Sequence, residues 1–106
     1  GPDMADPIKI RAPLPPDYAE LRVHLQHIME TGQRKDEKGQ IVPAHFIQTF
    51  SITVNGKALI DGQLNTSIAK NPLFGFRTRG IKAGDRLAVS WQDNKGEQRS
   101  DEIVVA

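Results

Sequence analysis

The sequence predicts an all-β protein, an immunoglobulin-like antiparallel β-sandwich of about seven strands. Short segments of alternating apolar and polar residues recur about every ten to fifteen residues, and clusters of Gly, Pro, Asn and Asp separate them. The length of 106 residues fits one domain with a modest core. Because the chain contains no cysteine, such a sandwich has to be held together by packing alone.

The first two predicted strands lie in residues 8–12 and 18–28. Apolar and basic residues alternate in the first segment, which is typical of a half-buried strand. The second segment also alternates, but it fits helical spacing too, and Asp17 with Glu20 is compatible with a helix capping box. We favour the strand, because a lone helix would have no partner in an otherwise all-β chain.

Residues 46–54 form the clearest predicted strand. Their even positions, beginning with Phe46, are mostly apolar and their odd positions mostly polar, which predicts a dry face and a wet face. The Asn-Gly pair that follows is a strong hairpin signal, because both residue types tolerate positive φ. Residues 57–64 are then predicted to pair back as the next strand, with Gly62 as a bulge or as its end.

The remaining strands are predicted at 73–79, 87–92 and 97–105, with a hairpin turn between the last two. Residues 29–42 are polar, charged and contain two glycines, so they are predicted to form a long exposed loop or an irregular hairpin. Long loops are often functional. Trp91 and the four phenylalanines are the expected centre of the core.

Composition excludes several classes of function. Fourteen basic and thirteen acidic side chains leave a formal charge of +1, so neither nucleic acid nor a membrane is an expected partner. No apolar run reaches the ~20 residues that span a bilayer, and we recognise no signal peptide. The absence of cysteine excludes disulfides, thiol nucleophiles and thiolate metal sites. We interpret residues 1–3 as an expression-tag remnant and residues 4–106 as a single domain starting at Met4.

Three histidines, His24, His27 and His45, are the candidate metal ligands. On a strand, His24 and His27 would point to opposite faces, so we expect ordinary surface histidines, no metal site and no cofactor. The adjacent Asp101 and Glu102 would also face opposite ways, and no carboxylate lies in a recognisably apolar setting, so no catalytic pair is expected. We find no nucleophile elbow and no phosphate-binding loop, and we therefore predict that the chain is not an enzyme.

The segment 62–84 is locally basic, because it contains four basic residues and no acidic one. It is either a surface that meets an anion or an acidic partner, or a solvated strand edge whose charges discourage aggregation. Phe74 and Phe76 lie next to these charges. They fit apolar anchors of an interface with a basic rim, and they fit core residues equally well.

Five short stretches, in order along the chain, form one recognisable pattern. They are METG at residues 29–32 with RKD at 34–36, IVPAHFI at 41–47, NGK at 55–57, KNP at 70–72 and WQDNKG at 91–96. Together they resemble the SoxZ family of bacterial sulfur oxidation. The similarity extends from about residue 8 to residue 101, which is nearly the whole chain.

The resemblance implies an immunoglobulin-like sandwich with a non-catalytic role. Proteins similar to SoxZ pair with SoxY, whose C-terminal arm carries sulfur intermediates covalently on a cysteine during thiosulfate oxidation. The SoxYZ heterodimer presents this arm transiently to the SoxAX, SoxB and SoxCD enzymes. The resemblance also implies a periplasmic location, reached by export together with SoxY and without a signal peptide of the chain's own.

Under this resemblance, the segments 29–46 and 70–79 are the hypothetical contact with SoxY or with the docking enzymes. The candidate partner-binding residues are Met29, Arg34, Pro43, His45, Phe46, Asn71, Phe74, Phe76, Arg77 and Arg79. A chain without its SoxY partner is a candidate for homodimerisation through the apolar part of this contact surface. Two other functions remain open, a small metal-binding module and a generic interaction module on the same scaffold.

Overall fold

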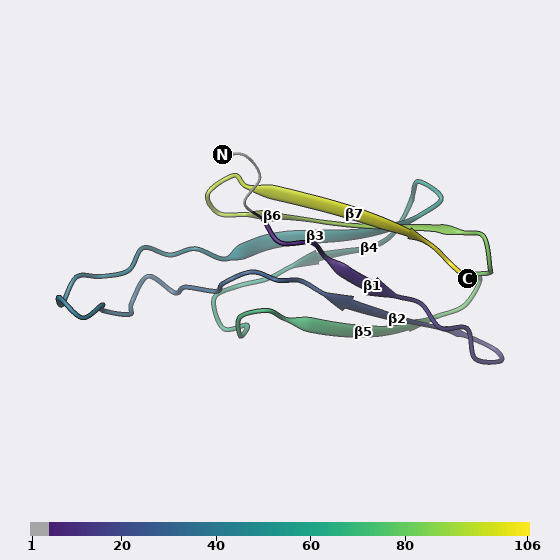
Figure 1. Cartoon of the computed structure of the whole chain (residues 1–106), viewed down its shortest axis with the longest axis horizontal. Helices are drawn as coiled ribbons and strands as arrows, with labels where there is room; N and C mark the ends of the chain where they lie inside the picture. The colour runs from purple at the N-terminus through teal and green to yellow at the C-terminus, as the bar shows by residue number, and fades with distance from the viewer. Residues whose placement is uncertain (1–4) are drawn as a thin grey trace.

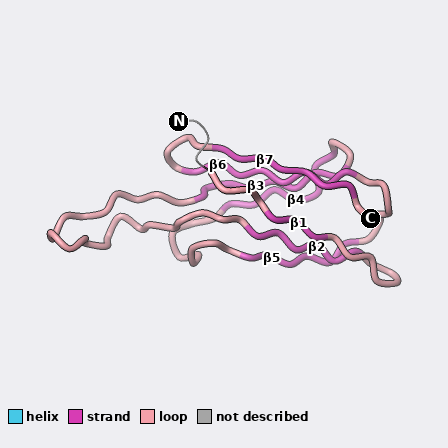
Figure 2. Tube along the Cα trace, viewed as in Figure 1, coloured by secondary structure: helices cyan, strands magenta, loops and turns pink. Residues whose placement is uncertain are grey.

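The computed structural model describes residues 5–106 and confirms the all-β prediction (Figures 1 and 2). The predicted tag remnant and the predicted start at Met4 lie outside the described residues. Seven strands are present: β1 (Lys9–Arg11), β2 (Ala19–His24), β3 (Ile47–Val54), β4 (Lys57–Gln63), β5 (Leu73–Thr78), β6 (Arg86–Asp93) and β7 (Gln98–Val104). Residues 5–106 include no helix that is long and apolar enough to cross a membrane.

The strands form two antiparallel sheets. One sheet has three strands in the order β1-β2-β5, and the other has four in the order β4-β3-β6-β7. The chain leaves the larger sheet after β4, adds β5 to β2, and returns to place β6 beside β3, which is the strand arrangement of immunoglobulin-like sandwiches. The ambiguous segment 18–28 contains β2, so its prediction as a strand is confirmed.

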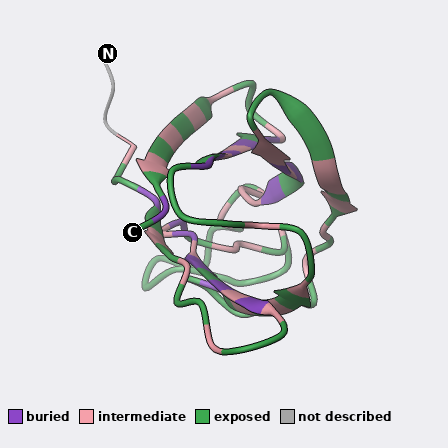
Figure 3. Cartoon of the chain, turned by 90° about the vertical axis from the view of Figure 1, so that its right-hand side faces the viewer, coloured by how far each residue is buried: buried purple, intermediate pink, exposed green. Residues whose placement is uncertain are grey.

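The core lies between the two sheets. Exposed and buried residues alternate along the strands when the molecule is viewed down its long axis (Figure 3). The buried apolar cluster comprises Ile8, Leu21, Val23, Leu25, Ile47, Phe50, Ile52, Leu87, Val89, Trp91 and Val105. Phe74 and Phe76 are half-buried, and their rings stack on Phe50 at centroid distances of 5.3 and 6.3 Å. Phe46 does not belong to the cluster, so its prediction as a core residue was wrong.

A β-bulge in β3 explains the error at Phe46. Ile47 pairs with Asp93 and Thr49 with the adjacent Gln92, so Gln48 is an extra residue in the ladder. An extra residue reverses which face the preceding side chains occupy. As a result Ile47 is fully buried whereas Phe46 is half-exposed, although strict alternation through 46–54 predicts the opposite.

The hairpin between β3 and β4 confirms the Asn-Gly turn, with φ of 50° at Asn55 and 83° at Gly56. Of the two alternatives for Gly62, the bulge was wrong, because the register shift lies between Ile52 and Thr53, and the strand end is close, because β4 ends at Gln63. Gly62 pairs directly with Phe50 near the end of β4. A Cβ at Gly62 would lie 2.2 Å from Phe50 Cε1, so the glycine leaves the space that the aromatic ring occupies.

Residues 29–46 form an irregular hairpin that projects from one end of the sandwich, and we call it the arm (Figure 1). Two isolated backbone pairs join its two lengths, Glu30 with His45 at the base and Lys35 with Ile41 near the tip. The molecule is accordingly elongated, with extents of 53 × 26 × 18 Å. Of the two predictions for this region, the irregular hairpin is confirmed.

Candidate functional sites: a buried histidine and aspartate cluster and a basic sheet face

Two histidines and an aspartate converge at the base of the arm. His27 follows β2, His45 lies at the end of the arm just before β3, and Asp93 is the last residue of β6. The Nε2 atoms of both histidines lie 2.9 Å from Asp93 Oδ2. The three atoms lie within 4.8 Å of one another. We call these residues the His/Asp cluster.

His27 is held firmly in this cluster. Its backbone N–H donates to Asn71 Oδ1 at 2.9 Å, and its backbone carbonyl accepts the Asn71 N–H at the same distance. Its ring meets the Trp91 ring edge to face, with centroids 4.7 Å apart, and only 5% of the side chain is exposed. Its Nδ1 atom lies against the backbone carbonyl of Ile28. Packing on one side and hydrogen bonds on the other therefore fix the imidazole.

Asp93 is a buried carboxylate with a full set of donors. Its Oδ1 accepts the backbone N–H groups of Lys95 and Glu97 at 2.9 and 2.8 Å, which shapes the turn between β6 and β7. Burial alone would raise the pKa of Asp93, but its side-chain contacts with His27 and His45 and the hydrogen bonds from these two amides outweigh it and hold the pKa below its usual value. The carboxylate is therefore ionised at neutral pH.

The expectation of ordinary surface histidines was wrong for His27, which is buried. β2 ends at His24, so the alternation of a strand does not apply at His27, and the chain there follows the turn at Asn71 instead. The ring of His27 meets that of His45, with centroids 4.8 Å apart, and these two histidines group with Asp93. Asp93 was missed as a buried carboxylate, although the inward alternation of β6 continues to it and was a signal in the sequence.

A second candidate site is the outer face of the three-stranded sheet. Directly paired residues of antiparallel strands have side chains on the same face. The pairs therefore place five charged side chains on this outer face, and they are Lys9, Arg11, Glu20, Arg22 and Arg77. Four are cations, and the single carboxylate, Glu20, contacts Arg22 at 3.0 Å. We call this surface the basic face.

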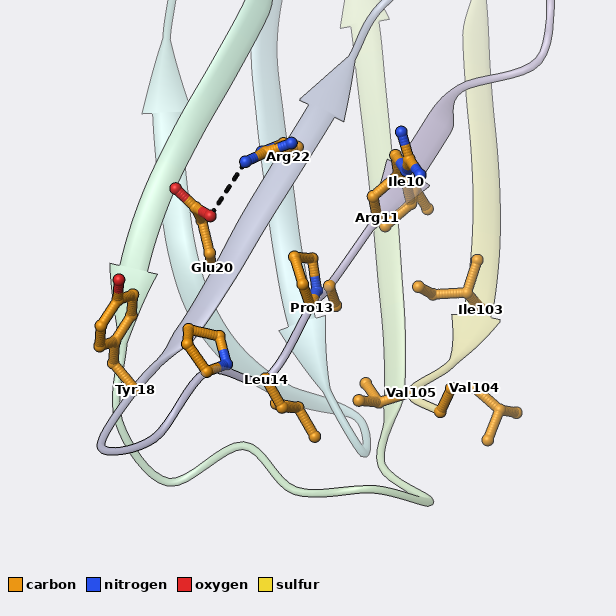
Figure 4. A pocket seen from close by; sticks show the side chains of 13 residues that line it. Ile10, Arg11, Pro13, Leu14, Tyr18, Glu20, Arg22, Ile103, Val104 and Val105 are labelled. Carbon is orange, nitrogen blue, oxygen red and sulfur yellow. Dashed lines mark hydrogen bonds and ion pairs between the residues drawn. The ribbon is translucent and has the colours of Figure 1, made fainter.

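An open groove adjoins the basic face (Figure 4). It runs between the loop that links β1 to β2 and the end of β7, with a volume of about 880 Å³. Arg11, Arg22 and Glu20 line it together with the exposed apolar side chains of Leu14 and Val104. The groove therefore combines apolar walls with charges that it shares with the basic face.

The predicted partner-binding residues fall into two groups. Those in the arm or at its base are Met29, Arg34, Pro43, His45 and Phe46, and those on or next to β5 are Asn71, Phe74, Phe76, Arg77 and Arg79. Their role in partner binding stays a prediction. The two groups meet where Asn71 holds the backbone of His27, next to the base of the arm.

Several of these residues also have contacts within the chain. Arg34 pairs with Glu30 at 2.7 Å, and this hydrogen-bonded cation lowers the pKa of the Glu30 carboxyl. The Arg77 guanidinium stacks over the Tyr18 ring at 5.2 Å from its centroid. Phe74 and Phe76 pack against the core cluster, which supports the core interpretation of the two that were left open.

Comparison with known families gives one result. The family model described as "Sulphur oxidation protein SoxZ" matches residues 8–104. The search of curated proteins gave no match. The matched range includes all seven strands, the arm and the His/Asp cluster. The chain therefore belongs to the SoxZ family of sulphur oxidation proteins.

Proposed function

We propose that this chain is the non-carrier subunit of a SoxYZ-type complex and binds SoxY as a single, non-catalytic domain. The observation that carries the proposal is the SoxZ family match over residues 8–104. In this role the sandwich is a rigid base for the SoxY arm, to which sulfur intermediates are attached covalently. SoxAX, SoxB and SoxCD then act on the arm rather than on this chain.

The composition supports a division of labour between the two subunits. Sulfur carried on a cysteine needs a thiol, and these 106 residues contain none. The chain therefore offers no competing attachment site for the intermediates. We propose the periplasm as its location, reached by export together with SoxY.

The basic face, with the adjoining segment 77–79, is the surface that we propose for SoxY or for the enzymes that visit the complex. Arg77 of β5 lies on the same outer face as Lys9, Arg11 and Arg22, so the local charge is larger than the segment 62–84 alone indicates. Four cations beside one carboxylate favour an acidic partner surface, because complementary charge accelerates association and excludes partners of like charge.

Gel filtration of this chain mixed with SoxY tests the pairing. We expect co-elution as a heterodimer at micromolar concentration. Separate elution of the two unmodified chains would contradict the proposal that this chain binds SoxY.

Charge reversal tests the surface separately. We expect Arg77→Glu combined with Arg79→Glu to weaken SoxY binding or to slow thiosulfate turnover at least about tenfold. Lys57→Glu combined with Lys95→Glu is the matched control, because both lysines are exposed and belong to the other sheet, Lys57 at the start of β4 and Lys95 in the turn between β6 and β7. Equal binding and equal turnover of the two double variants would remove the basic face from the proposal and leave the pairing intact.

A further inference from the structure

His27 has contacts that one neutral imidazole cannot satisfy. Its Nδ1 atom faces the carbonyl of Ile28, which only accepts hydrogen bonds, so Nδ1 carries the hydrogen. In the neutral ring the Nε2 atom then carries a lone pair and no hydrogen. Yet Nε2 lies 2.9 Å from Asp93 Oδ2, the oxygen of an ionised carboxylate. In this tautomer no hydrogen lies between the two atoms, and a cation shared by Nε2 and Oδ2 would satisfy both.

The surrounding atoms show which cation fits. His45 aims its own Nε2 at the same carboxylate oxygen, also at 2.9 Å. The other oxygen of Asp93 is occupied by backbone N–H groups, which leaves Oδ2 for the cation. A metal-binding histidine usually donates its second ring N–H to a backbone carbonyl or a carboxylate, and the carbonyl of Ile28 takes this place beside His27. Two imidazole nitrogens and one carboxylate oxygen are ligands that suit Zn²⁺.

We propose that His27, His45 and Asp93 form a binding site for one divalent metal ion of the zinc class, through Nε2, Nε2 and Oδ2. The proposal departs from the expectation of no metal site, which treated the histidines as separate surface residues.

The ligand atoms would have to move before they could hold this ion. Bond lengths of about 2.0–2.2 Å in a tetrahedral zinc site place the ligand atoms roughly 3.3 Å apart. The two nitrogen–oxygen distances of 2.9 Å would therefore have to lengthen by a few tenths of an ångström, and the two Nε2 atoms, which lie within 4.8 Å of each other, would have to come closer to roughly 3.3 Å. His45 is the ligand with room to adjust, because 20% of its side chain is exposed, against 5% for His27 and none for Asp93.

The same exposure indicates the open side of the site. A metal ion and a fourth ligand, such as water, would reach the site past His45, at the base of the arm. Trp91 packs on His27 and limits access of water from the core side. A metal bound here would join the two ends of the arm to the turn after β6.

Calorimetric titration with Zn²⁺ tests the site on the full chain after treatment with a chelator. We expect one Zn²⁺ per chain and an affinity that falls at least about tenfold in His27→Gln and in His45→Gln. His24→Gln is the matched control, because His24 lies on the outer face of the sheet and should leave binding unchanged. Circular dichroism establishes that each variant is folded, and the partly exposed His45 keeps the test usable if His27→Gln does not fold.

Cobalt provides a spectroscopic test of the ligands. Co²⁺ in place of Zn²⁺ should give the intense visible absorption of a tetrahedral site in the unmodified chain and in His24→Gln, and should lose it in His45→Gln. Two results would overturn the proposal. One is zinc binding that persists in the double variant His27→Gln with His45→Gln, which would show adventitious binding elsewhere. The other is no binding, with nitrogen NMR showing His27 protonated on both ring nitrogens, which would identify the cation as a proton.

Discussion

Among single residues, Asp93 links β6, the turn that follows it and the base of the arm. It ends β6, shapes the following turn and receives both histidines of the His/Asp cluster. We expect Asp93→Asn to destabilise the metal-free protein by about 3 kcal/mol, because an amide nitrogen or oxygen would leave a buried partner unsatisfied. Urea denaturation at neutral pH measures the change. Asp61→Asn, at an exposed position of β4, is the control, and equal stabilities of the two variants would contradict the prediction.

A second prediction for a single residue concerns Gly62. An alanine Cβ there would lie 2.2 Å from the Phe50 ring, which is itself buried and stacked on Phe74. We expect Gly62→Ala to lower the free energy of unfolding by about 1–3 kcal/mol, the usual range for overpacking. Gly75→Ala is the control, because nothing lies within 4 Å of a Cβ at that position. A difference of less than about 0.5 kcal/mol between the two variants would show that the ring moves aside freely.

The sequence could predict some of these residue roles and not others. Continued alternation along β6 places Asp93 on the inward face, so its burial was predictable. Its two histidine partners were not, because His27 and His45 lie outside regular strands, where periodicity carries no information. The contact of Phe50 with Gly62 depends on the register of two strands, which a single sequence does not fix.

Among the elements, two substitutions at the start of β3 test the position of the bulge. Ile47 is fully buried while Phe46 is half-exposed, despite its larger apolar ring. We expect Ile47→Ala to cost about 2–5 kcal/mol and Phe46→Ala to cost clearly less, because only the first leaves a cavity in the core. Thermal or urea unfolding of both variants gives the comparison. The reverse order would mean that the strand alternates without a bulge at Gln48.

A further prediction concerns the tip of the arm and does not depend on the packing of the core. Asp36 Oδ1 accepts the backbone N–H groups of Lys38 and Gln40 at 2.8 and 3.0 Å. We expect Asp36→Ala to speed hydrogen exchange of these two amides several-fold, while global stability changes by less than about 0.5 kcal/mol. Glu37→Ala, one exposed residue further on, should leave the exchange rates unchanged. A large loss of global stability in Asp36→Ala would show that the arm is coupled to the sandwich.

At the scale of elements, alternation and turn residues predicted the strands well. β2 was correctly preferred over a helix, and the Asn55-Gly56 turn follows from residue types that tolerate positive φ. The bulge at Gln48 was not predictable, because it depends on which residues of β6 the strand meets. The arm was predicted only as a loop or hairpin, since its base is defined by contacts with residues far along the chain.

Three aspartates, together with Glu30, have a lowered pKa and contribute to the response of the whole molecule to acid. Hydrogen bonds hold the pKa of Asp85 and of Asp101 below the usual value, from the Lys82 backbone N–H and the Arg99 guanidinium respectively, and the His/Asp cluster does so for Asp93. Groups with a lowered pKa in the folded state bind fewer protons there than in the unfolded chain. Their stabilisation is therefore present above about pH 4 and is lost as the pH falls below it.

We expect the free energy of unfolding to decrease steadily as the pH falls from about 5 to about 3, and the slope to become shallower in Asp101→Asn. Urea denaturation over this range measures the slope. Asp61→Asn serves again as the exposed control. A slope that is the same in Asp101→Asn and in the unmodified chain would contradict the assignment of Asp101 to the acid response.

Charge distribution is also a property of the whole molecule. A formal charge of +1 indicates no strongly charged surface, yet the basic face gathers four cations on one sheet. The sequence could not show this, because Lys9 and Arg77 come together only through their separate pairing with β2. The excess of basic residues in the segment 62–84 directed attention to Arg77 and Arg79, and pairing added Lys9, Arg11 and Arg22.

Because the His/Asp cluster fixes the base of the arm, the length of the arm can change with little effect on the stability of the sandwich. Both ends of the arm are fixed at this cluster, so the sheets keep the same contacts at the base of the arm whichever residues lie between its two ends. Doubling the length of a flexible loop with fixed ends costs only about 0.6 kcal/mol. The arm is therefore a place where residues can be inserted or exchanged, including a reporter peptide, while the sandwich keeps its register.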